Sequence, residues 1–477
     1  MNIERHLNTA MILRTLNMEN GLMKKLMYID LKFYLFAMSW LLAAVQAAAV
    51  TIQTSDIDKD GSPDYVIANK YYTAVLINPG AKSLDLSAPG VSRGGWFKEI
   101  VPSGSEKGFL ASENGVKFGL TQVLGAIVFT SPDQAARTEE PGAAKEPPAE
   151  SPKESAEPPA PAAASQPWQS SMEKKDNDTE VIVSFSQDVQ VSKERSYKLR
   201  IDTKFSDTSK ITIRGILFNN SKEILTTTVT PRPFFNISYE ALTPKSWISI
   251  PIKRSFNVGD KKIVSINSDP IPISKMMKYT EYNEDRFSKA ERWVSAGSIG
   301  ENGVFAILTK SPVSKIAFWK DNDCFGIEPT IKIEVPPEQR VEWEWTLLFG
   351  KGLESVSKVT DAGIYSIRNV EVKDSSEVII DYLPSKDMDG ISLDLTLNSP
   401  EGKMIMNKNK EFAGISPLKP GSVKLNLPPD MKNKRYLLKF EFFTNDVAMD
   451  QFTHWLNPQL KTVSPSSQPA PSRPAAE

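Results

Sequence analysis

The chain has 477 residues, with 57 Lys and Arg against 58 Asp and Glu, so its formal net charge at pH 7 is −1. A nucleic-acid partner is not expected, because neutralising phosphates requires a basic surplus. Cys324 is the single cysteine, which excludes an intrachain disulfide. The only histidines are His6, in the leader described next, and His454, so a Ser-His-Asp triad or a multi-histidine metal site would depend on His454.

The N-terminus has the pattern of a secretory signal. A basic lead-in that includes Lys24 and Lys25 precedes an apolar run over 33–45, and the alanines at 47–49 offer an A-x-A cleavage site. The run is shorter than the roughly 20 residues that a membrane span needs. We expect residues 1–49 to be a signal peptide, with export to the periplasm or exterior of a bacterium and no transmembrane span after cleavage; the alternative is an uncleaved anchor.

An aspartate-rich loop follows directly. Its pattern is D-x-D-x-D-G, formed by Asp56, Asp58, Asp60 and Gly61, with Asp64 three residues later. Carboxylates at alternate positions with a glycine at the sharp turn are typical of calcium loops. Ile67 stands where an EF-hand has its bidentate glutamate, so an EF-hand is not expected. We predict a structural Ca²⁺ held by the four aspartates, and the alternative is an Asp/Gly turn without metal. No other cofactor is expected.

Two segments have low-complexity composition. Residues 131–167 consist mainly of Pro, Ala, Glu and Ser without an aromatic residue, and the C-terminal end is similar. Such segments bury too little apolar area to offset the entropy lost on ordering. We predict a disordered linker insertion at 131–167 and a disordered tail at 456–477.

Elsewhere the apolar residues recur with a period of two. The clearest alternating segments are 197–202, 341–347, 391–397 and 436–442. This period indicates strands with one buried face, so Trp343 and Trp345 are expected in the core. Only residues 283–293 suggest a short helix. The expected fold class is all-β, with packed sandwiches.

A domain boundary is expected near residue 366. Before it, 50–130 and 168–366 supply enough strands for one large β-domain that carries the linker as a loop insertion. After it, 367–455 has the length and strand spacing of a small Ig-like β-sandwich.

Three segments, in order, resemble the galactose mutarotase-like (aldose 1-epimerase-like) supersandwich family. Residues 65–80 are similar to the family's opening hairpin, with Pro-Gly-Ala in place of a double glycine. Residues 231–237 (PRPFFNI) resemble a strand that carries H-x-Y-F-N-L in aldose epimerases. Residues 324–330 (CFGIEPT), followed by Pro-Pro-Glu and a strand, resemble the C-x-E-P/T-Q segment. The resemblance implies a supersandwich over 50–130 and 168–366, followed by the small sandwich.

The resemblance also implies a site. Glu328 matches the family's catalytic base, but Arg232 stands where the acid histidine belongs, and arginine keeps its proton. Standard epimerase activity is therefore not expected. Candidate sugar-binding residues are Arg232, Phe234, Asn236, Trp96 and Trp319, with Glu328 the candidate catalytic residue.

Each of these residues also has a structural interpretation. Glu328 could be a strand-end carboxylate paired with a lysine, Arg232 could form a salt bridge, and the aromatic residues could be core. We expect a carbohydrate partner. The alternatives are an envelope structural or interaction protein, in which Arg232 and Glu328 lie apart or buried in ion pairs, and an epimerase or lyase on uronic sugars that uses Glu328 or a tyrosine as base.

Overall fold

The computed structural model describes residues 50–57, 61–78, 97–103, 120–131, 168–175, 179–235, 245–258, 260–288, 290–298, 303–320, 324–372, 375–427, 435–445 and 447–456. The predicted signal peptide, nearly all of the predicted linker and the predicted tail beyond Leu456 lie outside these ranges. The all-β expectation is confirmed: the described residues form 29 strands and one short 3₁₀ helix, η1 (Ile273–Lys275).

A ten-stranded sheet carries the candidate site. In spatial order it consists of β1 (Thr51–Ser55), β2 (Asp64–Ala68), β3 (Tyr72–Leu76), β4 (Phe97–Pro102), β5 (Leu120–Leu124), β11 (Ile224–Pro233), β20 (Phe325–Val335), β19 (Lys315–Lys320) and β16 (Tyr279–Asn283), with β6 (Val128–Thr130) also paired to β11.

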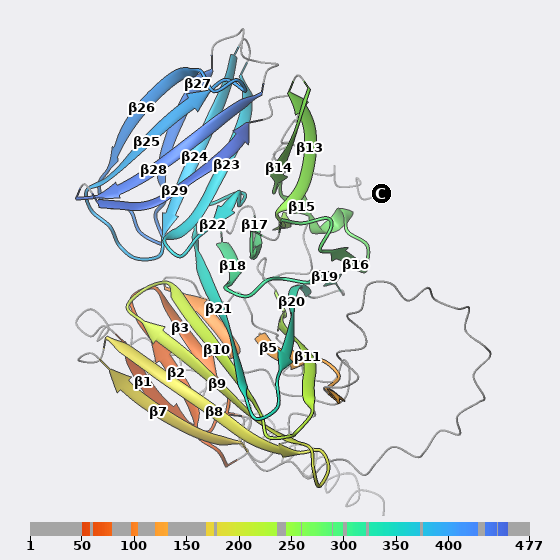
Figure 1. Ribbon diagram of the computed structural model, residues 1–477. Helices are drawn as coiled ribbons and strands as arrows, with labels where there is room; N and C mark the ends of the chain where they lie inside the picture. Colours follow the sequence, from red (N-terminus) through yellow and green to blue (C-terminus); the bar gives the residue numbers. More distant parts are fainter. Residues whose placement is uncertain are drawn as a thin grey trace, which may run out of the picture.

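A nine-stranded sheet packs against it. Its order is β15 (Ile271–Pro272), β12 (Ser246–Ser249), β17 (Trp293–Ser298), β18 (Gly303–Thr309), β21 (Arg340–Lys351), β10 (Lys210–Asn219), β9 (Ser196–Ser206), β8 (Glu180–Gln190) and β7 (Gln169–Lys175). The strands β13 (Ile252–Val258) and β14 (Lys261–Asn267) form a separate hairpin. It lies beside the C-terminal sandwich of strands β22 to β29 (Figure 1).

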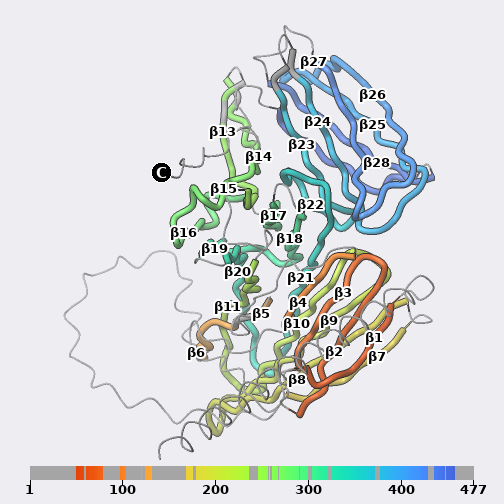
Figure 2. Tube along the Cα trace, turned by 180° about the vertical axis from the view of Figure 1, so that it is seen from behind, coloured from red at the N-terminus to blue at the C-terminus, as the bar shows by residue number. Residues whose placement is uncertain are grey.

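Alternation of apolar side chains builds the core between these two sheets. Tyr65 of β2 meets Phe185 of β8 with ring centroids 6.1 Å apart, and the two groups of strands form facing layers (Figure 2). Trp343 and Trp345 of β21 are 2% and 1% exposed, as predicted. Burying side chains of this size contributes most of the favourable free energy of such a sandwich.

The second sandwich consists of two four-stranded sheets. One is β22 (Lys358–Val359), β23 (Gly363–Val372), β24 (Ser375–Pro384) and β27 (Gly421–Leu427); the other is β26 (Met404–Phe412), β25 (Ile391–Asn398), β28 (Tyr436–Thr444) and β29 (Val447–Leu456). Tyr365 and Tyr382 stack in its core with centroids 4.8 Å apart. Since β22 and the start of β23 belong to this sandwich, it begins before the expected boundary at residue 367.

The two sandwiches share a buried apolar junction. The large domain contributes side chains from β12, β17, β18 and β21, and the small one contributes residues from the connection after β21 and from β22 to β24. They are Trp247, Trp293, Val304, Ala306, Leu348, Leu353, Val356, Val359, Ile364 and Leu383. Gly350 allows close approach, because a Cβ there would lie 2.3 Å from the carbonyl oxygen of Pro417.

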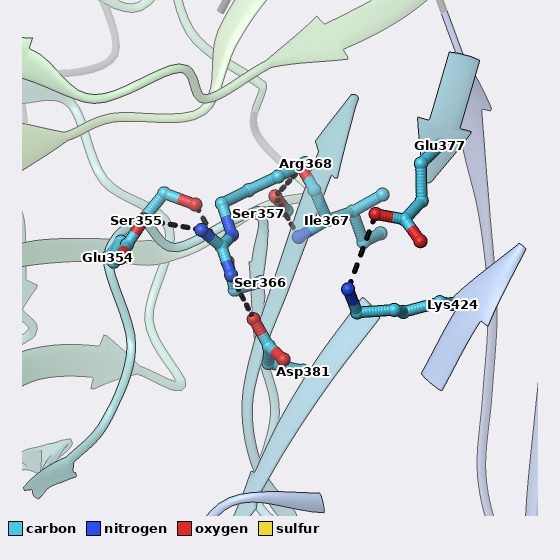
Figure 3. Close-up of polar contacts among 9 residues, drawn as sticks. All are labelled: Glu354, Ser355, Ser357, Ser366, Ile367, Arg368, Glu377, Asp381 and Lys424. Atoms are coloured by element: carbon cyan, nitrogen blue, oxygen red, sulfur yellow. Dashed lines mark hydrogen bonds and ion pairs between the residues drawn. The ribbon is translucent and has the colours of Figure 1, made fainter. Parts of the chain in front are cut away.

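A polar cluster fastens the connecting segment to the second sandwich (Figure 3). Arg368 of β23 lies between Glu354 of the connection and Asp381 of β24, and its Nη2 is 2.9 Å from the Asp381 carboxylate. The hydroxyl groups of Ser355 and Ser366 are 2.7 Å apart. These contacts fix the path of the chain where it passes from one domain to the other.

The helix expected at 283–293 is not formed. Residues 284–286 are turns, Phe287 makes an isolated bridge to Ile252, and Trp293 opens β17. Both aromatic side chains are fully buried, and this packing outweighs the helix propensity of the charged residues between them. Among the described residues, no helix has the length and apolar character needed to cross a membrane.

Candidate functional site

Prolines interrupt the pairing of two central strands of the ten-stranded sheet. The β11–β20 ladder runs to Val229 opposite Ile331, and the strands pair again where the Phe235 N–H donates to the Phe325 carbonyl at 2.8 Å. Alternation places the nitrogens of Pro231, Pro233 and Pro329 in the interval between these points. Proline has no N–H to donate, so the regular ladder between the two strands is interrupted there.

An ion pair spans this gap. Arg232 Nε donates to Glu328 Oε1 at 2.7 Å, and a second guanidinium nitrogen lies 3.4 Å from Oε2. The Trp319 indole N–H also donates to Oε1. The Glu328 side chain is 6% exposed and that of Arg232 is 26% exposed. The carboxylate thus lies below the surface with donors on both oxygens, while the guanidinium reaches solvent.

A glycine positions the tryptophan. Trp319 of β19 lies opposite Gly326 of β20, and a Cβ on Gly326 would be 2.3 Å from the indole nitrogen. The indole therefore lies across the bare backbone of Gly326 and points toward Glu328. Phe234 meets it edge-on, with centroids 5.1 Å apart and planes at 64°. These two rings form an aromatic wall beside the ion pair.

These side chains line one cavity of about 1060 Å³. Its floor is the face of β11, β20, β19 and β16, and its rim includes the loop after β5. The lining residues are Leu124, Gly125, Ala126, Thr228, Thr230, Arg232, Phe234, Tyr279, Asn283, Glu284, Ser314, Lys315, Ala317, Trp319, Glu328, Thr330 and Lys332. Pockets for small organic ligands measure roughly 300–1000 Å³, so this cavity is large.

Tyr279 stands at the edge strand of the floor. Its hydroxyl donates to Glu281, whose Oε1 also accepts from Lys315 Nζ at 2.9 Å. Partial burial and the nearby Glu281 carboxylate raise the pKa of Tyr279 to about 12, and the same hydrogen bonds lower the pKa of Glu281. Tyr279 therefore keeps its proton at neutral pH and is a hydrogen-bond donor rather than a base.

The structure brings together four of the six residues proposed from sequence for the sugar site: Arg232, Phe234, Trp319 and Glu328. Trp96 and Asn236 lie outside the described residues. Glu328 lies within β20 rather than at a strand end, and it pairs with an arginine rather than with the predicted lysine.

Sequence reasoning missed the polar side chains of the cavity floor. Thr230 and Thr330 have hydroxyl oxygens 2.9 Å apart across the proline gap, and Lys332 lies opposite Thr228. Tyr279 lines the cavity because β16 pairs with β19. The alternation of Thr228, Thr230 and Arg232 was a usable signal for a shared face, whereas the pairing of β16 with β19 had none.

The aspartate-rich loop is described only in part, because Asp58 and Asp60 lie outside the described residues. Asp64 is fully buried; its Oδ2 accepts the Ile57 N–H at 2.7 Å and its Oδ1 the Asn78 N–H at 2.9 Å. Asp56 accepts the Gly61 N–H at 3.1 Å, and Gly61 has φ +86°, which favours glycine. Carboxylate oxygens are ligands that suit a hard cation, and here they also order the turn through its backbone N–H groups. Within the described residues no group of three potential metal ligands is found.

The chain resembles solved structures of mutarotase-like proteins. A galactose mutarotase-like protein from Clostridium acetobutylicum is 10% identical, with 64% of this chain and 99% of that one covered and a TM-score of 0.38. A putative aldose 1-epimerase from Escherichia coli K12 is 11% identical, covering 64% and 100%, with a TM-score of 0.37. A galactose mutarotase related enzyme from Lactobacillus acidophilus is 11% identical, covering 62% and 99%, with a TM-score of 0.39.

These structures represent the family that the three sequence segments resemble. No protein-family model and no curated protein matches the chain. The likeness to these structures is one of fold.

Proposed function

We propose that this protein is an exported carbohydrate-binding protein without standard aldose epimerase activity. One observation carries the proposal: the rings of Phe234, Trp319 and Tyr279 line the same open cavity as the hydroxyl, guanidinium and ammonium groups of the floor. A sugar presents apolar C–H faces beside a rim of hydroxyls. Aromatic surface next to many hydrogen-bonding groups is the environment that such a ligand needs.

The geometry argues against ring-opening chemistry. A mutarotase needs a carboxylate that takes up a proton and an acid that donates one. Both oxygens of Glu328 already accept hydrogen bonds from Arg232 and Trp319. An arginine side chain is a poor proton donor, so Arg232 does not replace the acid histidine. The sequence's only histidine beyond the leader, His454, lies on β29 of the other sandwich.

Two alternatives make different predictions. An interaction protein without a sugar pocket is favoured by the ion pair between Arg232 and Glu328, and disfavoured by their position on an open cavity. A lyase or epimerase on uronic sugars needs a free base, and Tyr279, with its pKa raised to about 12, does not supply one at neutral pH. Binding without chemistry accounts for both observations.

A glycan array probed with the purified mature chain tests the proposal, with thermal shift on each hit. A ligand present at 100 times its Kd stabilises the folded state by about 2.7 kcal/mol, which is a shift of several degrees. The proposal fails if no mono- or oligosaccharide on the array binds. Conversion of bound sugars, followed by polarimetry or NMR, should not exceed the uncatalysed rate.

A matched pair of variants locates the site. Phe234→Ala removes one ring of the aromatic wall and should weaken binding at least tenfold. Phe218→Ala removes a 37% exposed ring from β10 of the other sheet and should leave affinity unchanged. If Phe218→Ala weakens binding and Phe234→Ala does not, the sugar binds elsewhere.

A further inference from the structure

The cavity floor is ordered in rows, because alternate residues of each strand face the same side. The first row, here the aromatic row, consists of Phe234, Trp319 and Tyr279. Trp319 lies directly opposite Tyr279 on β16, and its ring contacts Phe234 beyond β11. This row runs across the strands at one end of the cavity.

A hydroxyl row lies four residues further along each strand. Thr230 of β11 and Thr330 of β20 meet at 2.9 Å between their hydroxyl oxygens, and Lys315 of β19 lies opposite Thr330. Arg232 and Glu328 occupy the row between this one and the aromatic row. All five residues line the cavity.

The last row is formed by Thr228 and Lys332, which lie opposite one another. Lys332 is exposed, and among the described residues no ion pair to it is found. Thr228 is half-buried. Donors are therefore present at the end of the cavity that is farthest from the aromatic rings.

The distance between the end rows is longer than one sugar ring. Phe234 and Thr228 are six residues apart along one extended segment, which corresponds to about 20 Å at roughly 3.3 Å per residue. A monosaccharide stacked on Trp319 would leave the hydroxyl row and the Thr228–Lys332 row uncovered. The cavity volume of about 1060 Å³ is likewise at the upper end of the range for small-molecule pockets, and so exceeds what one sugar ring needs.

We infer that the cavity binds an oligosaccharide chain that runs along β11 and β20, rather than a single sugar. One ring stacks on the aromatic row, the next units cross the Arg232–Glu328 pair and the hydroxyl row, and a further unit accepts hydrogen bonds from Thr228 and Lys332. This inference rests on the proposed function. It adds that the ligand is an oligosaccharide and that it lies along the two strands.

The test is a length series measured by isothermal titration calorimetry on the mature chain. The series runs from monomer to hexamer of whichever glycan the array selects among cello-, malto- and galacturono-oligosaccharides. Affinity should rise at least tenfold from monomer to trimer or tetramer and then level off. Equal affinity for monomer and tetramer would overturn the inference while leaving sugar binding intact. If none of these glycans binds even as a hexamer, the chain-length inference is rejected, and the array decides the proposed function separately.

Variants at the far row provide the second measurement. Thr228→Val combined with Lys332→Met should remove the gain in affinity that the longer oligomers show, and leave monomer affinity unchanged. Thr226→Val is the matched control, because Thr226 lies two residues further along β11 and does not line the cavity. A double variant that binds the tetramer as tightly as the unmodified chain would rule out a subsite at this row.

Discussion

The ion pair across the proline gap should show strong energetic coupling. Glu328 is 6% exposed and pairs at 2.7 Å with an arginine that is 26% exposed. Two unit charges about 4 Å apart interact by about 4 kcal/mol at an effective dielectric constant of 20. The desolvation of the two charges offsets part of this attraction. Solvent around the partly exposed guanidinium weakens it further. We therefore expect a coupling free energy of about 2 kcal/mol.

A double-mutant cycle with Arg232→Met, Glu328→Gln and both together measures this coupling. Arg232→Met alone should lower the free energy of unfolding by about 3 kcal/mol, because the buried carboxylate keeps only the Trp319 donor. Unfolding in urea is followed by fluorescence and by circular dichroism, and their coincidence checks that one transition is observed. The reasoning is refuted if the two single effects add within about 0.5 kcal/mol.

The matched control is an exposed pair of the same residue types. Arg214 of β10 contacts Glu342 of β21, and their side chains are 46% and 34% exposed. Pairs of this kind typically contribute about 0.2–1 kcal/mol. The same cycle at Arg214 and Glu342 should therefore give a coupling below 1 kcal/mol.

The remaining predictions concern other parts of the molecule. Gly326→Ala should displace the Trp319 indole and cost about 1–3 kcal/mol; an unchanged fluorescence spectrum and affinity would contradict the packing described here. Leu353→Ala, at the fully buried domain junction, should cost about 2–5 kcal/mol and split the calorimetric transition in two; one unchanged transition argues against a stabilising junction. Burial and the charge of Lys358 lower the pKa of His454 to about 4, so the unfolded chain takes up its proton first and stability falls as the pH drops from 6.5 to 4. The free energy of unfolding should fall by about 1–2 kcal/mol over this pH range, less than for a fully enclosed imidazole, because His454 is only partly buried. This loss should be absent in His454→Gln. We also propose Ca²⁺ at the aspartate-rich loop, so 1 mM Ca²⁺ against EDTA should raise the melting temperature; no shift would reject the metal.

Much of the fold could be predicted because the period of two survives in the sequence wherever one face of a strand is buried. The segments 197–202, 341–347, 391–397 and 436–442 all lie within strands, namely β9, β21, β25 and β28. The helix predicted at 283–293 was wrong. Its pattern came from charged residues with good helix propensity. The buried Phe287 instead bridges to Ile252, and Trp293 opens β17 opposite Leu308 and packs in the apolar junction.

The site could be predicted only where residues carry a local signature. Arg232 and Glu328 were found because each stands beside proline in a segment that resembles a known motif. Tyr279 and Lys332 could not be found, because their place in the cavity depends on which strands become neighbours. Such pairings join residues far apart in the chain, and alternation alone does not specify them.

The prolines of β11 and β20 have a consequence for how the cavity floor can vary. The ladder between the two strands stops at Val229 and Ile331 and resumes only where Phe235 pairs with Phe325. Because main-chain bonds hold both ends of this interval, the Arg232–Glu328 pair inside it can be replaced by other side chains while the sheet on either side is kept. Recognition could be retuned here through two positions, without rebuilding the scaffold.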